Sequence, residues 1–139
     1  MQNDFSTGTN SSSTVAVVGL GKIGLPLAVQ YAKHGRRVIG CDINPQVVEI
    51  INAGQSHVQE EPELTNELPY LVSRGMLSAT QDTTEAVRQA NVVVVIVPVV
   101  VDDQHEVNFA AIDAATTAIG AGLQPGTLVI YETTLPVGT

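Results

Sequence analysis

The sequence predicts an α/β protein in which helices cover both faces of a doubly wound parallel sheet, giving a three-layer α/β/α arrangement. Short apolar segments alternate along the chain with segments of helical periodicity, which is the order of elements found in parallel sheets with crossover helices. A glycine-rich segment, residues 19–24, lies between the first apolar segment and the first helical one. Asp42 ends the second apolar segment, about 20 residues after the glycines. Together these three observations predict a Rossmann-type nucleotide-binding fold.

Five strands are predicted from their apolar and β-branched composition. The fourth is apolar throughout, as expected for a central parallel strand that is covered on both faces. The predicted strands are residues 14–18, 37–42, 77–80, 92–97 and 127–131.

The first two helices are predicted from their ends as well as from their periodicity. Apolar residues recur at helical spacing from Leu25 onwards, and Gly35 is placed to end that helix. Asn44 is a good N-cap with Pro45 at the first helical position, and Gly54 closes this second helix.

Three further helices are predicted. Residues 64–74 form one that is expected to be interrupted near Pro69. Asp82 with Glu85 three residues later resembles a capping box, which opens another. Asn108 caps the last helix. The side chains of that helix expected to face the core are Ile112, Ala115 and Ile119.

Composition narrows the possible partners and organisation. The chain has 139 residues, which suits one domain, predicted as residues 14–139. Residues 1–13 are rich in Ser, Thr, Asn and Gly and are expected to form a disordered lead-in. A net charge of −8 argues against nucleic acid as a partner. Apolar segments fall short of the roughly 18 residues that a membrane span requires, so no membrane association is expected. A single cysteine fits the reducing cytoplasm.

The glycine-rich segment predicts a binding site for a pyrophosphate. Gly19 permits a tight turn out of the strand, Gly21 lets a phosphate approach the backbone, and Gly24 allows close packing of helix on strand. Lys22 and Ile23 complete the loop, so the pyrophosphate is expected to lie over free N–H groups at the helix N-terminus. The alternative is a turn that is glycine-rich by chance.

The position of Asp42 indicates whether the domain binds NAD or NADP. A carboxylate at the end of the second strand accepts hydrogen bonds from the adenosine ribose hydroxyls and repels a 2′-phosphate, so NAD is expected rather than NADP. The alternative is a turn aspartate that leads into Asn44 and Pro45.

Several segments together resemble the NAD-binding domain of the UDP-glucose/GDP-mannose dehydrogenase family. The family typically reads G-x-G-Y-[VI]-G-L-P, E-P-G-L, V-P-T-P and S-T-x-P-V-G-T in this order. The similar segments here are residues 19–26 (GLGKIGLP), 61–64 (EPEL), Val97-Pro98 and residues 132–139 (ETTLPVGT). The resemblance extends over nearly all of residues 15–139.

The resemblance implies NAD-dependent oxidation of the C6 alcohol of a nucleotide sugar to a carboxylate in two steps. It places Thr134 near the nicotinamide and the catalytic water, in a supporting catalytic role. The family's catalytic cysteine lies in a later region, so this chain alone is expected to be inactive. The sugar nucleotide would be shared with a C-terminal domain, and the full-length enzyme would be a homodimer. The expected cofactor-binding residues are Gly19, Gly21, Lys22, Ile23, Gly24, Asp42, Val97, Pro98, Val99 and Thr134.

Other candidate residues have ordinary interpretations. Cys41 lies inside a predicted strand, where a cysteine is usually a small buried hydrophobe and not a nucleophile. The three histidines, His34, His57 and His105, lack metal-ligand spacing, so no metal site is expected. Thr134 itself could be an ordinary threonine after a strand.

Two rival functions stay open at this point. The first is another NAD(P) dehydrogenase of the hydroxyacid type, which shares a similar N-terminal fold. The second is a stand-alone nucleotide-binding or regulatory module without catalysis.

Overall fold

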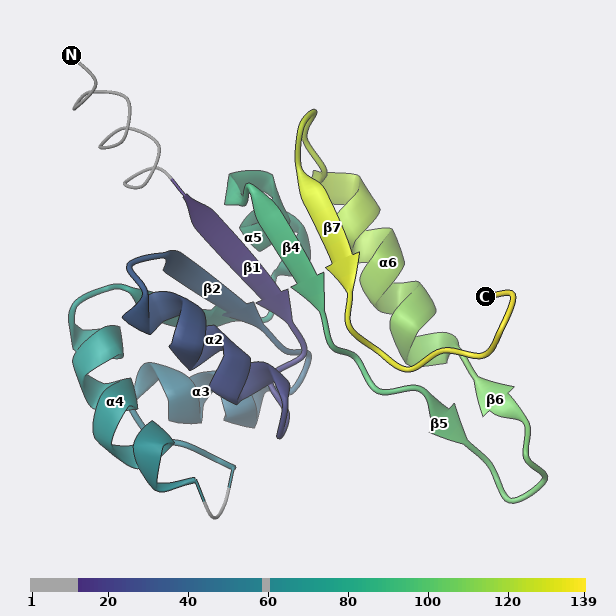
Figure 1. Ribbon diagram of the computed structural model, residues 1–139, viewed down its shortest axis with the longest axis horizontal. Coiled ribbons are helices and arrows are strands. Elements are labelled where there is room, and N and C mark those ends of the chain that lie inside the picture. The colour runs from purple at the N-terminus through teal and green to yellow at the C-terminus, as the bar shows by residue number, and fades with distance from the viewer. Residues whose placement is uncertain (1–12, 59–60) are drawn as a thin grey trace.

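The computed structural model describes residues 13–58 and 61–139. Its centre is a five-stranded, all-parallel sheet in the order β3-β2-β1-β4-β7 (Figure 1). The predicted lead-in, residues 1–13, lies outside the described residues except for Ser13, whose carbonyl accepts a hydrogen bond from the Arg37 N–H. The strands of the sheet are β1 (Thr14–Val18), β2 (Arg37–Cys41), β3 (Leu77–Thr80), β4 (Val92–Val95) and β7 (Leu128–Tyr131).

The strand order reverses at β1, and this reversal positions the site. From β1 the chain builds outward through β2 to β3, then crosses over to build β4 and β7 on the other side of β1. The loops after β1 and β4 therefore leave the sheet in opposite directions. In doubly wound sheets the crevice between two such loops, at the carboxyl ends of the strands, is where ligands bind.

Helices cover both faces of the sheet, which confirms the predicted three-layer α/β/α fold (Figure 1). Along β1, Val15 and Val17 belong to one apolar cluster and Ala16 and Val18 to another, because alternate residues of a strand point to opposite faces. The first cluster includes side chains of α2 (Gly24–Lys33), α3 (Pro45–Asn52) and α4 (Pro62–Ser73). The second includes side chains of α5 (Thr83–Gln89) and α6 (Ala110–Gly122).

Two of the three predicted N-caps, Asn44 and Asp82, form the hydrogen bonds expected of them. The side-chain oxygen of Asn44 accepts from the Gln46 N–H, and Pro45 is the first residue of α3. The Asp82 carboxylate accepts from the Glu85 N–H at the start of α5. The third prediction was wrong by one residue: the N-cap of α6 is Phe109, and Asn108, one position earlier, accepts from the Ala110 N–H.

Helix α4 corrects one prediction. It runs without interruption from Pro62 to Ser73, with Pro69 inside it. The proline removes one helical hydrogen bond, but the helix buries Leu64, Leu68 and Leu71 in the core. This burial outweighs the local preference, so the helix continues through the proline.

Three strands are shorter than predicted, and one pair is new. Strand β2 ends at Cys41 and not at Asp42, β4 ends at Val95 and not at residue 97, and β7 begins at Leu128 and not at residue 127. After β4 the chain forms an antiparallel hairpin of β5 (Val100–Val101) and β6 (Val107–Asn108), which extends away from the sheet (Figure 1). None of the described helices is long and apolar enough to cross a membrane.

Candidate functional site

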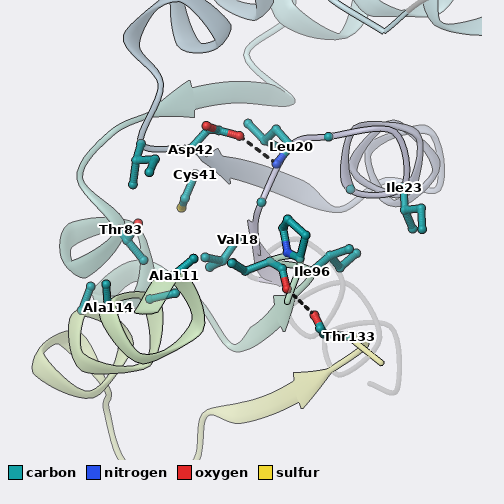
Figure 2. A pocket seen from close by; sticks show the side chains of 18 of the residues that line it. Val18, Leu20, Ile23, Cys41, Asp42, Thr83, Ile96, Ala111, Ala114 and Thr133 are labelled. Atoms are coloured by element: carbon teal, nitrogen blue, oxygen red, sulfur yellow. Dashed lines mark hydrogen bonds between the residues drawn. The ribbon is translucent and has the colours of Figure 1, made fainter. Parts of the chain in front are cut away.

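A cavity of about 890 Å³ lies at the carboxyl ends of the central strands. Its walls come from the loop after β1, the ends of β2 and β3, the segments after β4 and β7, and the facing sides of α5 and α6 (Figure 2). All ten residues predicted to bind a cofactor line it: Gly19, Gly21, Lys22, Ile23, Gly24, Asp42, Val97, Pro98, Val99 and Thr134. The fold therefore brings together four segments that are far apart in the sequence.

The three glycines of the loop after β1 meet different surroundings. A Cβ atom on Gly19 would lie 2.3 Å from the Ile96 carbonyl oxygen, and one on Gly24 would lie 1.8 Å from the Gly19 oxygen. Both positions therefore exclude any side chain. A Cβ on Gly21 would meet no atom within 4 Å. Gly21 thus leaves an open space beside the backbone, of the kind that a phosphate group can fill.

The N-terminus of α2 faces this space without a protein cap. Its N-cap residue, Ile23, makes no side-chain hydrogen bond to the helix, and the first turn holds no acidic residue. Helices α3 and α5, by contrast, are capped by Asn44 and Asp82. The first N–H groups of a helix carry partial positive charge and need acceptors. Those of α2 are suited to an anionic ligand.

Asp42 is held against the glycine loop from the end of β2. Its Oδ2 accepts a hydrogen bond from the Leu20 N–H at 3.1 Å (Figure 2). Its Oδ1 accepts from the Asn44 N–H at 3.0 Å. The carboxylate therefore serves the turn into α3, which was the alternative interpretation, and also lines the cavity. The two roles are compatible, since a carboxylate has about four acceptor positions.

The far side of the cavity is formed by the segments after β4 and β7. Thr133 is half-buried, and its hydroxyl donates to the Val97 carbonyl at 2.9 Å (Figure 2). Thr134 is exposed and also lines the cavity. The sequence prediction singled out Thr134 and assigned no role to Thr133.

Sequence reasoning also missed an apolar wall contributed by α6. Its side chains are small, which leaves room for a flat group between α6 and the end of β2. The periodic signal was present, because alanines recur at the i, i+3, i+4, i+7 spacing of one helix face. The residues are Ala111, Ala114, Ala115 and Ala118. The other lining residues that were not predicted include Leu20, Ile43, Gln81, Thr83, Thr84 and Ile96.

Cys41 lines the cavity but is suited to packing and not to nucleophilic chemistry. The residue is fully buried, and burial raises the pKa of its thiol to about 12. The reactive thiolate is therefore scarce at neutral pH. Within the described residues, no three His, Cys, Asp or Glu side chains lie close enough to hold a metal ion.

Comparison with known proteins connects this cavity to a family. Residues 13–139 match the pattern of the UDP-glucose/GDP-mannose dehydrogenase family, NAD binding domain. The chain is 41% identical over 128 residues to a UDP-N-acetyl-D-mannosamine dehydrogenase of Salmonella typhimurium, covering 92% of this chain and 29% of that protein. It is 43% identical over 130 residues to the enzyme of the same name from Campylobacter jejuni, covering 94% and 31%.

A solved structure agrees in fold. The UDP-D-ManNAc dehydrogenase from Pyrococcus horikoshii superposes with a TM-score of 0.83 at 34% identity, over 90% of this chain and 29% of that one. The chain thus spans about 30% of the length of the relatives it matches. The match over residues 13–139 favours neither of the two rival functions.

Proposed function

Because the chain belongs to the UDP-glucose/GDP-mannose dehydrogenase family, as its NAD-binding domain, we propose that the cavity is the cofactor half of a nucleotide-sugar 6-dehydrogenase site. The whole reaction would be NAD-dependent oxidation of the C6 alcohol of a UDP- or GDP-sugar to a carboxylate. The observation that carries this proposal is the open space at Gly21 beside the uncapped N-terminus of α2.

The glycine loop would hold the pyrophosphate. Gly21 offers bare backbone, and the N–H groups at the start of α2 are suited to donate to the phosphate oxygens. Lys22 adds the positive charge of an exposed ammonium group on the same loop. This charge offsets part of the field of the cavity's carboxylates, Asp42, Asp82 and Glu132.

Asp42 would hold the adenosine ribose. Its carboxylate is fixed by the Leu20 and Asn44 N–H groups and lies at the edge of the cavity. The remaining acceptor positions can take hydrogen bonds from ribose hydroxyls, while a 2′-phosphate would meet like charge. The proposed preference is therefore for NAD over NADP.

Val97, Pro98, Val99 and Thr134 would surround the nicotinamide half. They lie after β4 and β7, across the crevice from Asp42. When bound, the nicotinamide supplies the hydride acceptor. The protein's part is to orient the nicotinamide and exclude water with the side chains of Val97, Pro98 and Val99. The exposed Thr134 hydroxyl can hold a water or a substrate hydroxyl beside it.

The remaining parts of the reaction would come from a longer protein. The relatives are about three times the length of this chain, so we assign the catalytic cysteine and most sugar contacts to a C-terminal domain. We further propose a homodimeric full-length enzyme in the cytoplasm. The single, buried cysteine fits a reducing compartment.

Calorimetric titration with NADH tests the proposed site. Gly21→Val fills the open space and should abolish binding, while the domain stays folded because a Cβ there meets no atom within 4 Å. Gly120→Val is the matched control, since a Cβ at Gly120 also meets no atom within 4 Å and the residue lies outside the cavity. Unchanged NADH affinity in Gly21→Val would refute the site.

A further inference from the structure

We propose that Thr133 is a positioning residue for the cofactor, acting through the backbone of Val97. Its hydroxyl fixes the segment of residues 97–99, which forms one wall of the cavity. This inference rests on the proposed function, because it assigns that wall to the nicotinamide half of NAD. It concerns a different residue from Thr134, which is exposed and lines the cavity.

The Thr133 hydroxyl continues the pairing of β4 with β7 beyond the end of the sheet. The last backbone link between the two strands is the hydrogen bond from the Glu132 N–H to the Val95 carbonyl, at 2.9 Å. Past this point the two chains diverge, and the next link is a side chain. Thr133 Oγ1 lies 2.9 Å from the Val97 oxygen and 3.4 Å from the Val95 oxygen. A hydroxyl has one proton to donate, so the shorter contact, to Val97, is the stronger bond.

On the opposite side of the same segment, the backbone hydrogen bonds of the described residues reach as far as Ile96, and the Val97 side chain packs against the apolar cluster of α5 and α6. The Ile96 N–H donates to the Val18 carbonyl at 2.8 Å. The Ile96 oxygen packs against Gly19, where a Cβ would lie 2.3 Å from it. From Val97 onward the described chain leaves β1 and turns toward the hairpin. Loss of the Thr133 hydroxyl should therefore free the Val97 carbonyl and loosen the backbone of Pro98 and Val99, while the packed Val97 side chain and the glycine loop stay in place.

Removal of the Thr133 hydroxyl would deprive the Val97 carbonyl of its hydrogen-bond donor. Thr133 is half-buried, so a valine of the same shape would keep the packing but leave that carbonyl without its donor. The carbonyl must then turn toward water, because an unpaired and partly buried acceptor is unfavourable. Such a turn moves the adjoining Pro98 and Val99, which line the cavity.

Two ligands separate positioning from general stability. ADP-ribose contains the adenosine and the pyrophosphate of NADH but lacks the nicotinamide. Thr133→Val should weaken NADH binding about fivefold and leave ADP-ribose binding unchanged. Thr133→Ser, which keeps the hydroxyl, should restore most of the NADH affinity. Calorimetry on each folded variant gives both dissociation constants.

Thr127 provides a matched control at the other end of the same strand pair. Its hydroxyl donates to the Ala90 carbonyl at 3.4 Å, just before β7 begins. Thr127→Val also removes a hydroxyl that links β7 to the neighbouring chain, but this residue lies outside the cavity. It should bind NADH and ADP-ribose as the unmutated domain does.

The results of these titrations test the role of Thr133 separately from the proposed cofactor site. Equal losses for NADH and ADP-ribose, or no loss for either, would refute the role of Thr133 while leaving the cofactor site intact. Failure of the unmutated domain to bind NADH would refute the proposed site, and this inference with it. If Thr133→Val does not fold, the inference is tested by NMR titration of the unmutated domain with NADH and with ADP-ribose. The amide signals of Val97 and Val99 should shift with NADH and stay unmoved with ADP-ribose, and equal shifts with both would overturn the inference.

Discussion

The carboxylate of Asp42 accepts a hydrogen bond from the backbone N–H of Leu20, with 3.1 Å between Oδ2 and N, although 22 residues separate them. The bond joins the end of β2 to the glycine loop after β1. A second one, from the Asn44 N–H to Oδ1 at 3.0 Å, fixes the carboxylate from the other side. Asp42 is therefore oriented before any ligand arrives, which lowers the entropic cost of binding.

This geometry predicts different results for two substitutions of Asp42. Asp42→Asn keeps an acceptor oxygen for Leu20 but removes the charge, so the domain should fold normally and its preference for NADH over NADPH should narrow. Asp42→Ala removes both acceptors and should also lower the free energy of unfolding by about 1 kcal/mol. Titrations with NADH and NADPH measure the preference. Equal affinity for the two in the unmutated domain would show that Asp42 does not hold the ribose.

The glycine contacts predict that Gly24→Ala destabilises the fold. A Cβ at Gly24 would lie 1.8 Å from the Gly19 oxygen, which belongs to the backbone and cannot move aside as a flexible side chain could. The free energy of unfolding should fall by about 1 to 3 kcal/mol. Urea unfolding measures it, with Gly21→Ala as the control in the same loop. A variant with an unchanged urea midpoint would refute the close packing of α2 on the loop.

The buried thiol predicts a loss of stability at alkaline pH. Burial raises the pKa of Cys41 from its ordinary value of 9.0 to about 12, so between these values the unfolded chain releases a proton that the folded chain keeps. The contribution of this thiol to the free energy of unfolding is fully present below pH 9. It is lost as the pH rises, by about 1 kcal/mol at pH 10. Tyrosines and lysines titrate in this range too, so the measurement is the difference from Cys41→Ala. Above pH 9 the free energy of unfolding should fall less steeply with pH in Cys41→Ala than in the unmutated domain. Parallel plots of the free energy of unfolding against pH would contradict the burial of the thiol.

The proposal places the cofactor site in this domain and the catalytic cysteine in a C-terminal domain. It therefore predicts that this chain does not oxidise nucleotide sugars by itself. Two-step oxidation to a carboxylate needs an activated nucleophile to hold the aldehyde stage, and the single cysteine, Cys41, is buried beside Asp42. Incubation with NAD and a panel of UDP- and GDP-sugars should give no increase in NADH absorbance. Steady turnover that persists in Cys41→Ala would place the chemistry within these residues.

The sequence predicted the features that depend on local chain geometry. The sequence predicted the position of the glycine loop and of Asp42, because the spacing of the glycines and the ends of the first two strands depend on residues that are close together in the chain. The fold class followed from the alternation of apolar strands with helices, and the family model and solved structures confirm it. The caps at Asn44 and Asp82 were predictable for the same reason, since each bond joins residues two or three apart.

The features that were missed depend on tertiary contacts. Helix α4 passes through Pro69 because its leucines are buried against the sheet, a benefit that local propensity does not contain. The hairpin of β5 and β6 was not predicted from the sequence. Asp102 turns the chain there, since its carboxylate accepts from the Gln104 and Glu106 N–H groups. Thr133 was passed over because its partner, Val97, is 36 residues away.

An NMR titration of the unmutated domain with NADH tests the proposed cofactor site most directly. The proposal places the pyrophosphate over residues 21–24 and the ribose at Asp42, so the backbone amide signals of these residues should shift and saturate together. ADP-ribose should reproduce those shifts, because it carries the same phosphates and adenosine. Saturable NADH binding that leaves the amides of residues 21–24 unmoved would contradict a cofactor site at the glycine loop.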